Sequence, residues 1–181
     1  MHAALRARQV VNLANGSTLA GLGVAVLGGA RVASSADGLL VGTGYRLPVP
    51  PAPAFCLGNV ILTRLDGLTP GARLFRHEAR HATQYAWCGG LVMVPLYLAA
   101  AAASWALTGD FGARNVFERR AGLADGGYAD KPLRPGIQRA RRPASHLGAV
   151  SGSGPLAGAA GRLRPWPASA APAGSTASPS R

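Results

Sequence analysis

The chain has 181 residues, enough for one domain with or without tails, and 48% of them are apolar while only 14% are charged. Its net charge of +12 is uneven, because the segment from Lys131 to Arg181 contains eight basic residues and no acidic one. That segment has a single Phe, Trp or Tyr residue, Trp166, which leaves little for stacking on nucleic-acid bases. We therefore do not expect nucleic acid as the partner. The two cysteines, Cys56 and Cys88, are too few to define a disulfide framework.

The C-terminal segment, 131–181, is rich in proline, glycine and alanine and shows no hydrophobic period. Such a composition cannot fill a core, so we expect a disordered basic tail. Two interpretations of this tail remain open: an arm that binds anionic lipid or nucleic acid, and an extension without a specific partner.

Residues 1–37 form a weakly apolar N-terminal segment. An apolar run, Val10–Ala30, follows two arginines and is interrupted by five glycines and four polar residues. The polar residues are Asn12, Asn15, Ser17 and Thr18. This order is compatible with a packed helix, with a helix that contacts a membrane, or with a signal peptide cut before Asp37. We expect a membrane-associated or cytoplasmic protein, and secretion is the least favoured of the three.

Two strand-like runs follow, and they open a candidate domain at 38–130. The runs Leu39–Arg46 and Phe55–Arg64 are rich in β-branched and aromatic residues. The segment PVPPAP, Pro48–Pro53, separates them, and its four prolines favour an extended loop over a tight hairpin.

Three helical patterns come next and predict an α+β fold, a few strands followed by helices. The first begins at Thr69 and Pro70, which suit an N-cap and first helical residue, and ends at Gly89 and Gly90. The second runs from Leu91 to Leu107, and the third opens at Asn115 and ends near Gly126.

The first of these helices carries the motif H-E-x-x-H, formed by His77, Glu78 and His81. Residues i and i+4 lie above one another on a helix, so both imidazoles can reach one tetrahedral zinc ion. Glu78, one step round the helix, can then take a proton from a water molecule activated by the metal. A solvated helix face with a histidine pair is the alternative interpretation.

A zinc site of this kind needs a third protein ligand, and glutamate is scarce in the chain. Glu118 is the only glutamate besides Glu78, which makes it the leading candidate. The pattern Asn115-x-x-Glu118 also fits a capping box, in which the glutamate would bond to a backbone N–H instead. Weaker candidates for the third ligand are His146, Cys88, Cys56, His2 and the aspartates.

The apolar stretch from Cys88 to Leu107 has no charged residue and is long enough to cross a bilayer. If it crossed one, Glu118 would lie roughly 30 Å from the histidines, on the other side. A straight spanning helix and a His77/His81/Glu118 site therefore exclude one another. Pro95 and the run Ala99–Ala103 favour a tightly packed helix that folds back beside the first.

Three blocks of this sequence resemble the gluzincin branch of the zincin metallopeptidases, and more closely a group of small bacterial proteins with the same pattern. The blocks are CLGNVIL from Cys56, HEARHATQY from His77 and NVFERRA from Asn115. The resemblance covers roughly residues 39–128. Val116 stands where the pattern usually has proline, and Cys56 where it has threonine or a similar residue.

The resemblance implies a zincin-like core that binds Zn²⁺ through His77, His81 and Glu118, with Glu78 as catalytic base. It also implies a peptide or protein substrate lying extended beside the strand LGNVIL. Four residues could stabilise a transition state: Arg114, Arg119, Arg120 and Tyr128. We expect a zinc-dependent hydrolase of the metallopeptidase type. The alternative is a non-catalytic protein that uses the same scaffold, or apolar helices alone, to sit on an anionic membrane surface.

Overall fold

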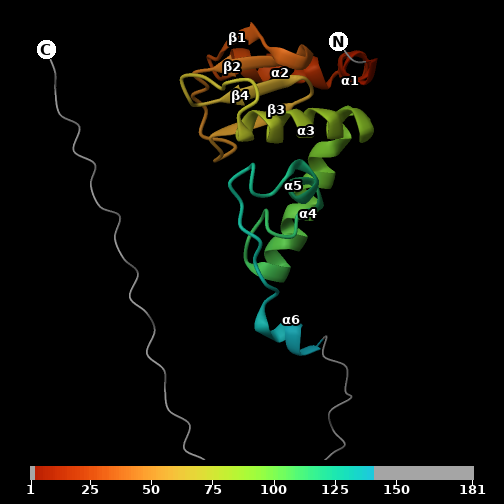
Figure 1. The fold of residues 1–181 in the computed structure, drawn as a ribbon, viewed down its shortest axis with the longest axis vertical. Coiled ribbons are helices and arrows are strands. Elements are labelled where there is room, and N and C mark those ends of the chain that lie inside the picture. Colours follow the sequence, from red (N-terminus) through yellow and green to blue (C-terminus); the bar gives the residue numbers. More distant parts are fainter. Residues whose placement is uncertain (1–2, 141–181) are drawn as a thin grey trace, which may run out of the picture. The chain divides into compact units, whose positions relative to one another are not determined.

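The computed structural model describes residues 3–140, which form a mixed α+β fold with a small four-stranded sheet and several helices (Figure 1). In chain order the elements are α1 (Ala3–Ala14), α2 (Ser17–Leu27), β1 (Arg31–Ser34), β2 (Leu40–Thr43), β3 (Ala54–Leu57), β4 (Val60–Thr63), α3 (Arg73–Trp87), α4 (Met93–Thr108), α5 (Val116–Ala121) and α6 (Pro135–Ala140). Short 3-10 turns precede β2 and α4, at Ala36–Gly38 and Gly90–Val92. The α+β class is confirmed.

The sheet has the strand order β1-β2-β4-β3, so β4 is central and β3 lies at an edge. The β2–β4 pair is parallel, and the two outer pairs are antiparallel. All four residues of β4 are buried, because alternate side chains face opposite layers. Val60 and Leu62 pack with Ala25 of α2, while Ile61 packs with Phe75 of α3. The sheet therefore lies between α2 and α3, the helix that carries the motif.

The N-terminal segment, 1–37, contributes a strand to the same sheet as the candidate domain 38–130. Its strand β1 pairs with β2, and its two helices are bent by 71° at a break around Gly16, whose φ is +78°. Three of its polar residues, Asn12, Ser17 and Thr18, are buried and hydrogen-bonded. Asn12 donates to Asn59 Oδ1 (3.0 Å) and to the carbonyl of Ala82 in α3 (2.8 Å). This network holds α1 against both the sheet and α3.

The run Phe55–Arg64 is a tight hairpin, β3 and β4, where the sequence suggested one strand. Gly58 makes the turn with φ +63°, and a side chain there would collide with the backbone of Ser17 at the α1–α2 break. The proline-rich segment before it is a loop that links β2 to β3, as expected.

The motif helix α3 begins at Arg73, later than the Thr69–Pro70 start that the sequence suggests, and Ala72 is its N-cap residue. It ends as expected before Gly89, whose φ is +75°, and α4 ends before Gly109, with φ +78°. The third helix, α5, is shorter than predicted, because Gly122 ends it.

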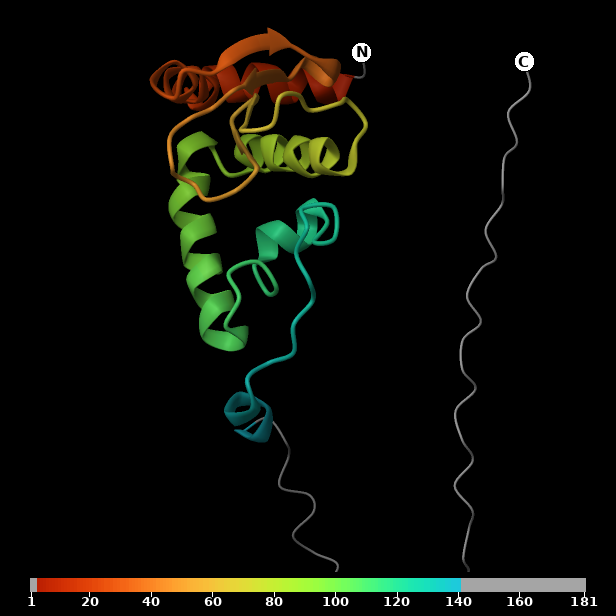
Figure 2. The same cartoon turned by 90° about the vertical axis from the view of Figure 1, so that its left-hand side faces the viewer.

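The apolar helix α4 does not fold back beside α3. It leads away from the end of α3, and the following chain returns through α5, which lies beside α3 (Figure 2). Only 22% of the residues in its apolar stretch are buried, so it is not tightly packed. By length and composition, the stretch Gly90–Thr108 could cross a membrane. The helices α1 and α2 reach the required length only when they are taken together, and the bend between them interrupts that stretch.

Residues 131–140, assigned to the tail from sequence, continue the folded part of the chain. Lys131 pairs with Asp110 (2.6 Å), and the backbone N–H of Arg134 donates to the carbonyl of Leu107 (2.9 Å) before α6 begins. The expected disorder of the remaining tail lies outside the described residues.

The close approach of α2 to the sheet gives a test of this architecture. A Cβ at Gly21 would overlap the carbonyl oxygen of Leu57 and the side chain of Val60, whereas a Cβ at Gly23, in the same helix, meets nothing. We expect Gly21→Ala to destabilise the protein by about 1–3 kcal/mol through overpacking. Gly23→Ala should stabilise it by up to about 1 kcal/mol through helix propensity. Chemical denaturation of both variants measures the difference, and equal effects would contradict this packing.

Candidate metal centre

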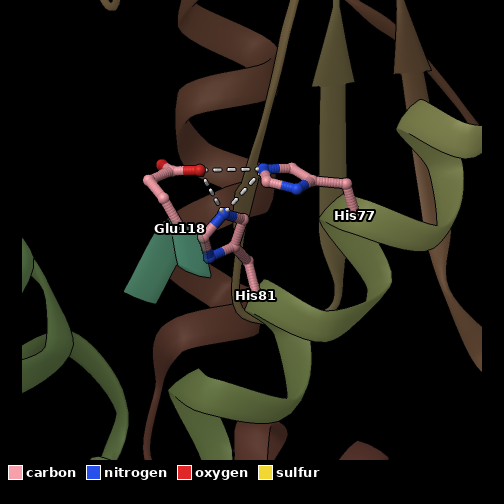
Figure 3. Close-up of side chains that lie close together, drawn as sticks. All are labelled: His77, His81 and Glu118. Carbon is pink, nitrogen blue, oxygen red and sulfur yellow. Dashed lines mark hydrogen bonds and ion pairs between the residues drawn. The ribbon is translucent and has the colours of Figure 1, made fainter. Parts of the chain in front are cut away.

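Three buried side chains from two helices meet below the sheet (Figure 3). His77 and His81 lie one turn apart on α3, and Glu118 comes from α5. Glu118 Oε2 lies 3.0 Å from His77 Nε2 and 3.6 Å from His81 Nε2, and the two Nε2 atoms are 3.1 Å apart. The structure thus brings together the three residues that the sequence proposed as ligands.

The outer nitrogen of each imidazole faces a hydrogen-bond acceptor. His77 Nδ1 lies 3.1 Å from the carbonyl oxygen of Gly122, and His81 Nδ1 lies 2.8 Å from Gln84 Oε1. Gln84 in turn donates through Nε2 to the carbonyl of Phe117 in α5 (2.9 Å), which fixes its Oε1 toward the histidine. Each Nδ1 must therefore carry the proton, which leaves each neutral Nε2 as a lone-pair donor.

Two imidazole lone pairs and a carboxylate consequently converge on one point, within 4.8 Å of one another. Such a group of acceptors is repulsive unless a cation lies between them, and either a proton or a metal ion can serve. Glu118 Oε2 has no well-oriented hydrogen-bond donor among the described residues, although it points into the cluster. Two nitrogens and one oxygen, from side chains that are each oriented by a further hydrogen bond, suit a zinc ion.

Glu118 is not the capping residue of α5. Asn115 is the N-cap, because its Oδ1 accepts from the backbone N–H of Phe117 (3.0 Å), and its own N–H, which a capping box would pair with Glu118, donates to the carbonyl of Gly112 (3.0 Å). The second oxygen of Glu118 accepts a hydrogen bond from Tyr97 on α4. Burial opposes ionisation of Glu118, but the hydrogen bond from Tyr97 and the nearby His77 and His81, when protonated, outweigh it and lower the pKa of Glu118 to about 2. The carboxylate is thus ionised and available to a cation.

Glu78 lies beside this cluster at a cavity of about 300 Å³. It is buried, and its Oε2 has no hydrogen-bond partner within residues 3–140. Burial raises the pKa of Glu78 above its ordinary value, although the neighbouring histidines oppose the change. A carboxylate with a raised pKa and a free oxygen at a cavity can exchange a proton with a water molecule there.

The cavity wall combines the edge strand β3 with α3, α4 and the chain after α5. Of the four residues proposed as transition-state stabilisers, Tyr128 alone lines it, and its hydroxyl stays protonated because burial raises its pKa to about 12. Arg114 and Arg119 instead pair with Asp130.

The weaker candidates for a third ligand that lie within residues 3–140 do not join the cluster. Cys56 lines the same cavity, but its thiol donates to the carbonyl of Gly58 (3.3 Å). Cys88 caps the end of α3 and is not part of the metal-ligand group. His2 and His146 lie outside the described residues.

Sequence reasoning missed two residues of this centre, Tyr97 and Gln84. Gln84 follows His81 by three residues, so it shares the helix face of the histidines, and that spacing was a usable signal. Tyr97 lies in an apolar helix, and its position in the sequence has no spacing that relates it to the histidines or to Glu118.

The metal-free protein should lose stability as the pH rises. Burial alone would lower the pKa of His77, but the hydrogen bond and charge of Glu118, with Glu78, raise it above 6.5. Protonated His77 therefore favours the folded state below about pH 6.5, and this contribution is lost as the pH rises through the folded pKa. Calorimetry with a chelator between about pH 6 and 8 measures it. In Glu118→Gln the decline should be smaller, and an equal decline in both proteins would contradict the assignment.

Comparison with known proteins adds no relative: no family model, no curated protein and no solved structure matches this chain. Function must therefore be inferred from the geometry of the centre.

Proposed function

We propose that this protein is a zinc-dependent hydrolase of the metallopeptidase type. The observation that carries the proposal is the convergence of His77, His81 and Glu118, three buried lone-pair donors, beside the unpartnered carboxylate oxygen of Glu78. In this proposal the first three residues hold Zn²⁺ and Glu78 is the general base. The order of strands, motif helix and glutamate helix agrees with the gluzincin resemblance, and we propose a zincin-like core on that basis.

A bound zinc ion would supply Lewis-acid activation of the water and of the scissile carbonyl. The side chains of the protein supply the proton transfers and the hydrogen bonding to the substrate. Glu78 takes a proton from the attacking water as the new C–O bond forms, and delivers it to the leaving nitrogen as the C–N bond breaks. Tyr128, whose hydroxyl remains protonated, is placed on the cavity wall to donate a hydrogen bond to substrate oxygen.

A polypeptide substrate fits the edge of the sheet. β3 is an edge strand and all four of its residues, 54–57, line the cavity, so an extended peptide can pair with it by strand addition. Most of the remaining wall is apolar, which favours apolar side chains at the cleavage site.

Two substitutions separate catalysis from metal binding. Glu78→Gln should retain about one equivalent of zinc and lose activity by at least about 100-fold, because the general base is gone. Glu118→Ala should lose zinc, because one of three ligands is removed. Metal content is measured by mass spectrometry on protein purified without chelator, and hydrolysis with quenched fluorescent peptides that carry apolar residues.

The wild-type protein is the reference for zinc content in this comparison, and His77→Ala is the control that lacks one ligand. Less than about a tenth of an equivalent of zinc in the wild type, unchanged in His77→Ala, would refute the metal site. If the wild type binds zinc but Glu78→Gln hydrolyses peptides equally well, Glu78 is not the general base, although the metal site remains supported.

The role of Gln84 can be tested against its neighbour. Gln84→Ala removes the acceptor that orients His81, so we expect zinc affinity to fall by about 10- to 100-fold. Thr83→Ala is the matched control, because the Thr83 hydroxyl bonds only to the carbonyl of Ala79 in its own helix. Competition with a zinc-binding dye measures both affinities, and equal values for the two variants would show that Gln84 does not position the ligand.

A second candidate function is a non-catalytic membrane-associated protein on the same scaffold. The observation that favours it is the extent of exposed apolar surface on α4. It predicts zinc binding without hydrolysis of any peptide, so the activity of the wild type relative to Glu78→Gln distinguishes the two functions.

A further inference from the structure

The helix α4 is apolar on all sides, but residues 3–140 pack along one side of it only. Its three buried residues, Met93, Ala101 and Ser104, share one stripe with Tyr97, which bonds to Glu118. The other sides expose large apolar side chains: Val94, Leu96, Leu98 and Trp105, with Leu91 and Val92 in the preceding turn. A helix that is apolar all round normally lies within a core or a lipid environment. Something apolar must therefore cover this face.

Aromatic side chains mark both ends of the helix. Trp87, immediately before the turn that leads into α4, is 85% exposed. At the other end the ring of Trp105 is stacked with that of Phe111, and both rings are substantially exposed. Exposed tryptophan at both ends of an apolar surface is typical of contact with the interface of a bilayer.

The charges around this face have the sign that anionic lipid requires. No acidic residue occurs between Glu78 and Asp110, so the helix itself carries no negative charge. Arg134 lies over the ring of Trp105, with its guanidinium carbon 4.9 Å from the centroid. Arg134 has no carboxylate partner within residues 3–140, which contain every acidic side chain of the chain. The aromatic end of α4 is thus also cationic.

The same helix cannot span the bilayer in this fold. Tyr97, in the second turn of the helix, bonds to Glu118, and the returning segment carries ion pairs such as Lys131–Asp110. Those charges would lie in hydrocarbon if α4 crossed the membrane. Contact with the membrane must therefore be from one side.

We propose that the exposed face of α4, with Trp87 and Trp105 at its ends, docks on an anionic lipid bilayer as a peripheral surface. Val94 and Leu98 belong both to this face and to the wall of the cavity, so docking brings the mouth of the cavity to the membrane. If the site is the hydrolase proposed above, on which this consequence rests, its substrates are polypeptide segments held at the membrane surface.

Vesicle binding by the full-length protein tests the docking directly. Sedimentation with phosphatidylcholine vesicles containing about a third phosphatidylglycerol should recover the protein, with weaker recovery at high salt. The double variant Val92→Glu/Leu96→Glu should bind at least about tenfold more weakly, because two apolar side chains that the bilayer would bury are replaced by charged ones. Leu65→Glu is the matched control, because Leu65 is 46% exposed, like Leu96, but lies outside α4. It should bind as the wild type does.

Further variants distinguish docking on lipid from other ways of covering this face, and show that docking does not depend on the hydrolase activity. Arg134→Glu should weaken binding to anionic vesicles and leave binding to neutral ones unchanged, and Glu78→Gln should bind as the wild type does. The proposal is overturned if the wild type ignores the vesicles or if Leu65→Glu behaves as the α4 variant does. Resistance to alkaline carbonate would show a spanning helix instead. A lipid-independent dimer that the α4 substitutions dissociate would show that a second copy covers the face.

Discussion

Three buried acceptors that converge on one point, and therefore need a cation between them, set the main constraint on this fold. His77 and His81 can present their Nε2 lone pairs together only because Gly122 and Gln84 hold the protons on the opposite nitrogens. Both of these supports depend on α5, directly through the carbonyl of Gly122 or through the bond from Gln84 to Phe117. The short helix α5 must therefore return to α3, and the excursion through α4 is the path by which it does so.

The motif helix is also held from the other side, by polar groups in an apolar segment. Asn12 binds the carbonyl of Ala82, one residue after His81, and also Asn59 in the β3–β4 turn. Asn59 in turn donates to Thr18 at the start of α2 (3.0 Å). Buried polar networks of this kind specify one arrangement, since a shifted helix would leave several groups unsatisfied. The LGN turn and the α1–α2 break thus fix the position of α3 relative to the sheet.

The site was predictable to the extent that it follows from spacing on one helix and from the scarcity of one residue type. The i, i+4 histidines required only helix geometry, and Glu118 followed because the chain has one other glutamate. The fold was less predictable, because tertiary contacts decided it. Asn12 and Thr18 weakened the apolar pattern of the N-terminal segment, although they are buried there for hydrogen bonding. Gly58 divides one strand-like run into a hairpin because it packs against Ser17, a contact that no local pattern reveals.

The helix α4 shows why the choice between a metal site and a membrane helix was too narrow. A charge-free stretch of this length predicts a spanning segment only if nothing along it needs a polar partner, and Tyr97 does, because it holds Glu118. One stripe of the helix therefore serves the metal centre, while the rest remains apolar and uncovered within the described residues. An apolar surface of that extent is costly in water, so its retention beside the mouth of the cavity points to a functional contact there. Under the docking proposal the two sequence features describe one arrangement, in which a single helix supports the candidate centre and orients it toward lipid.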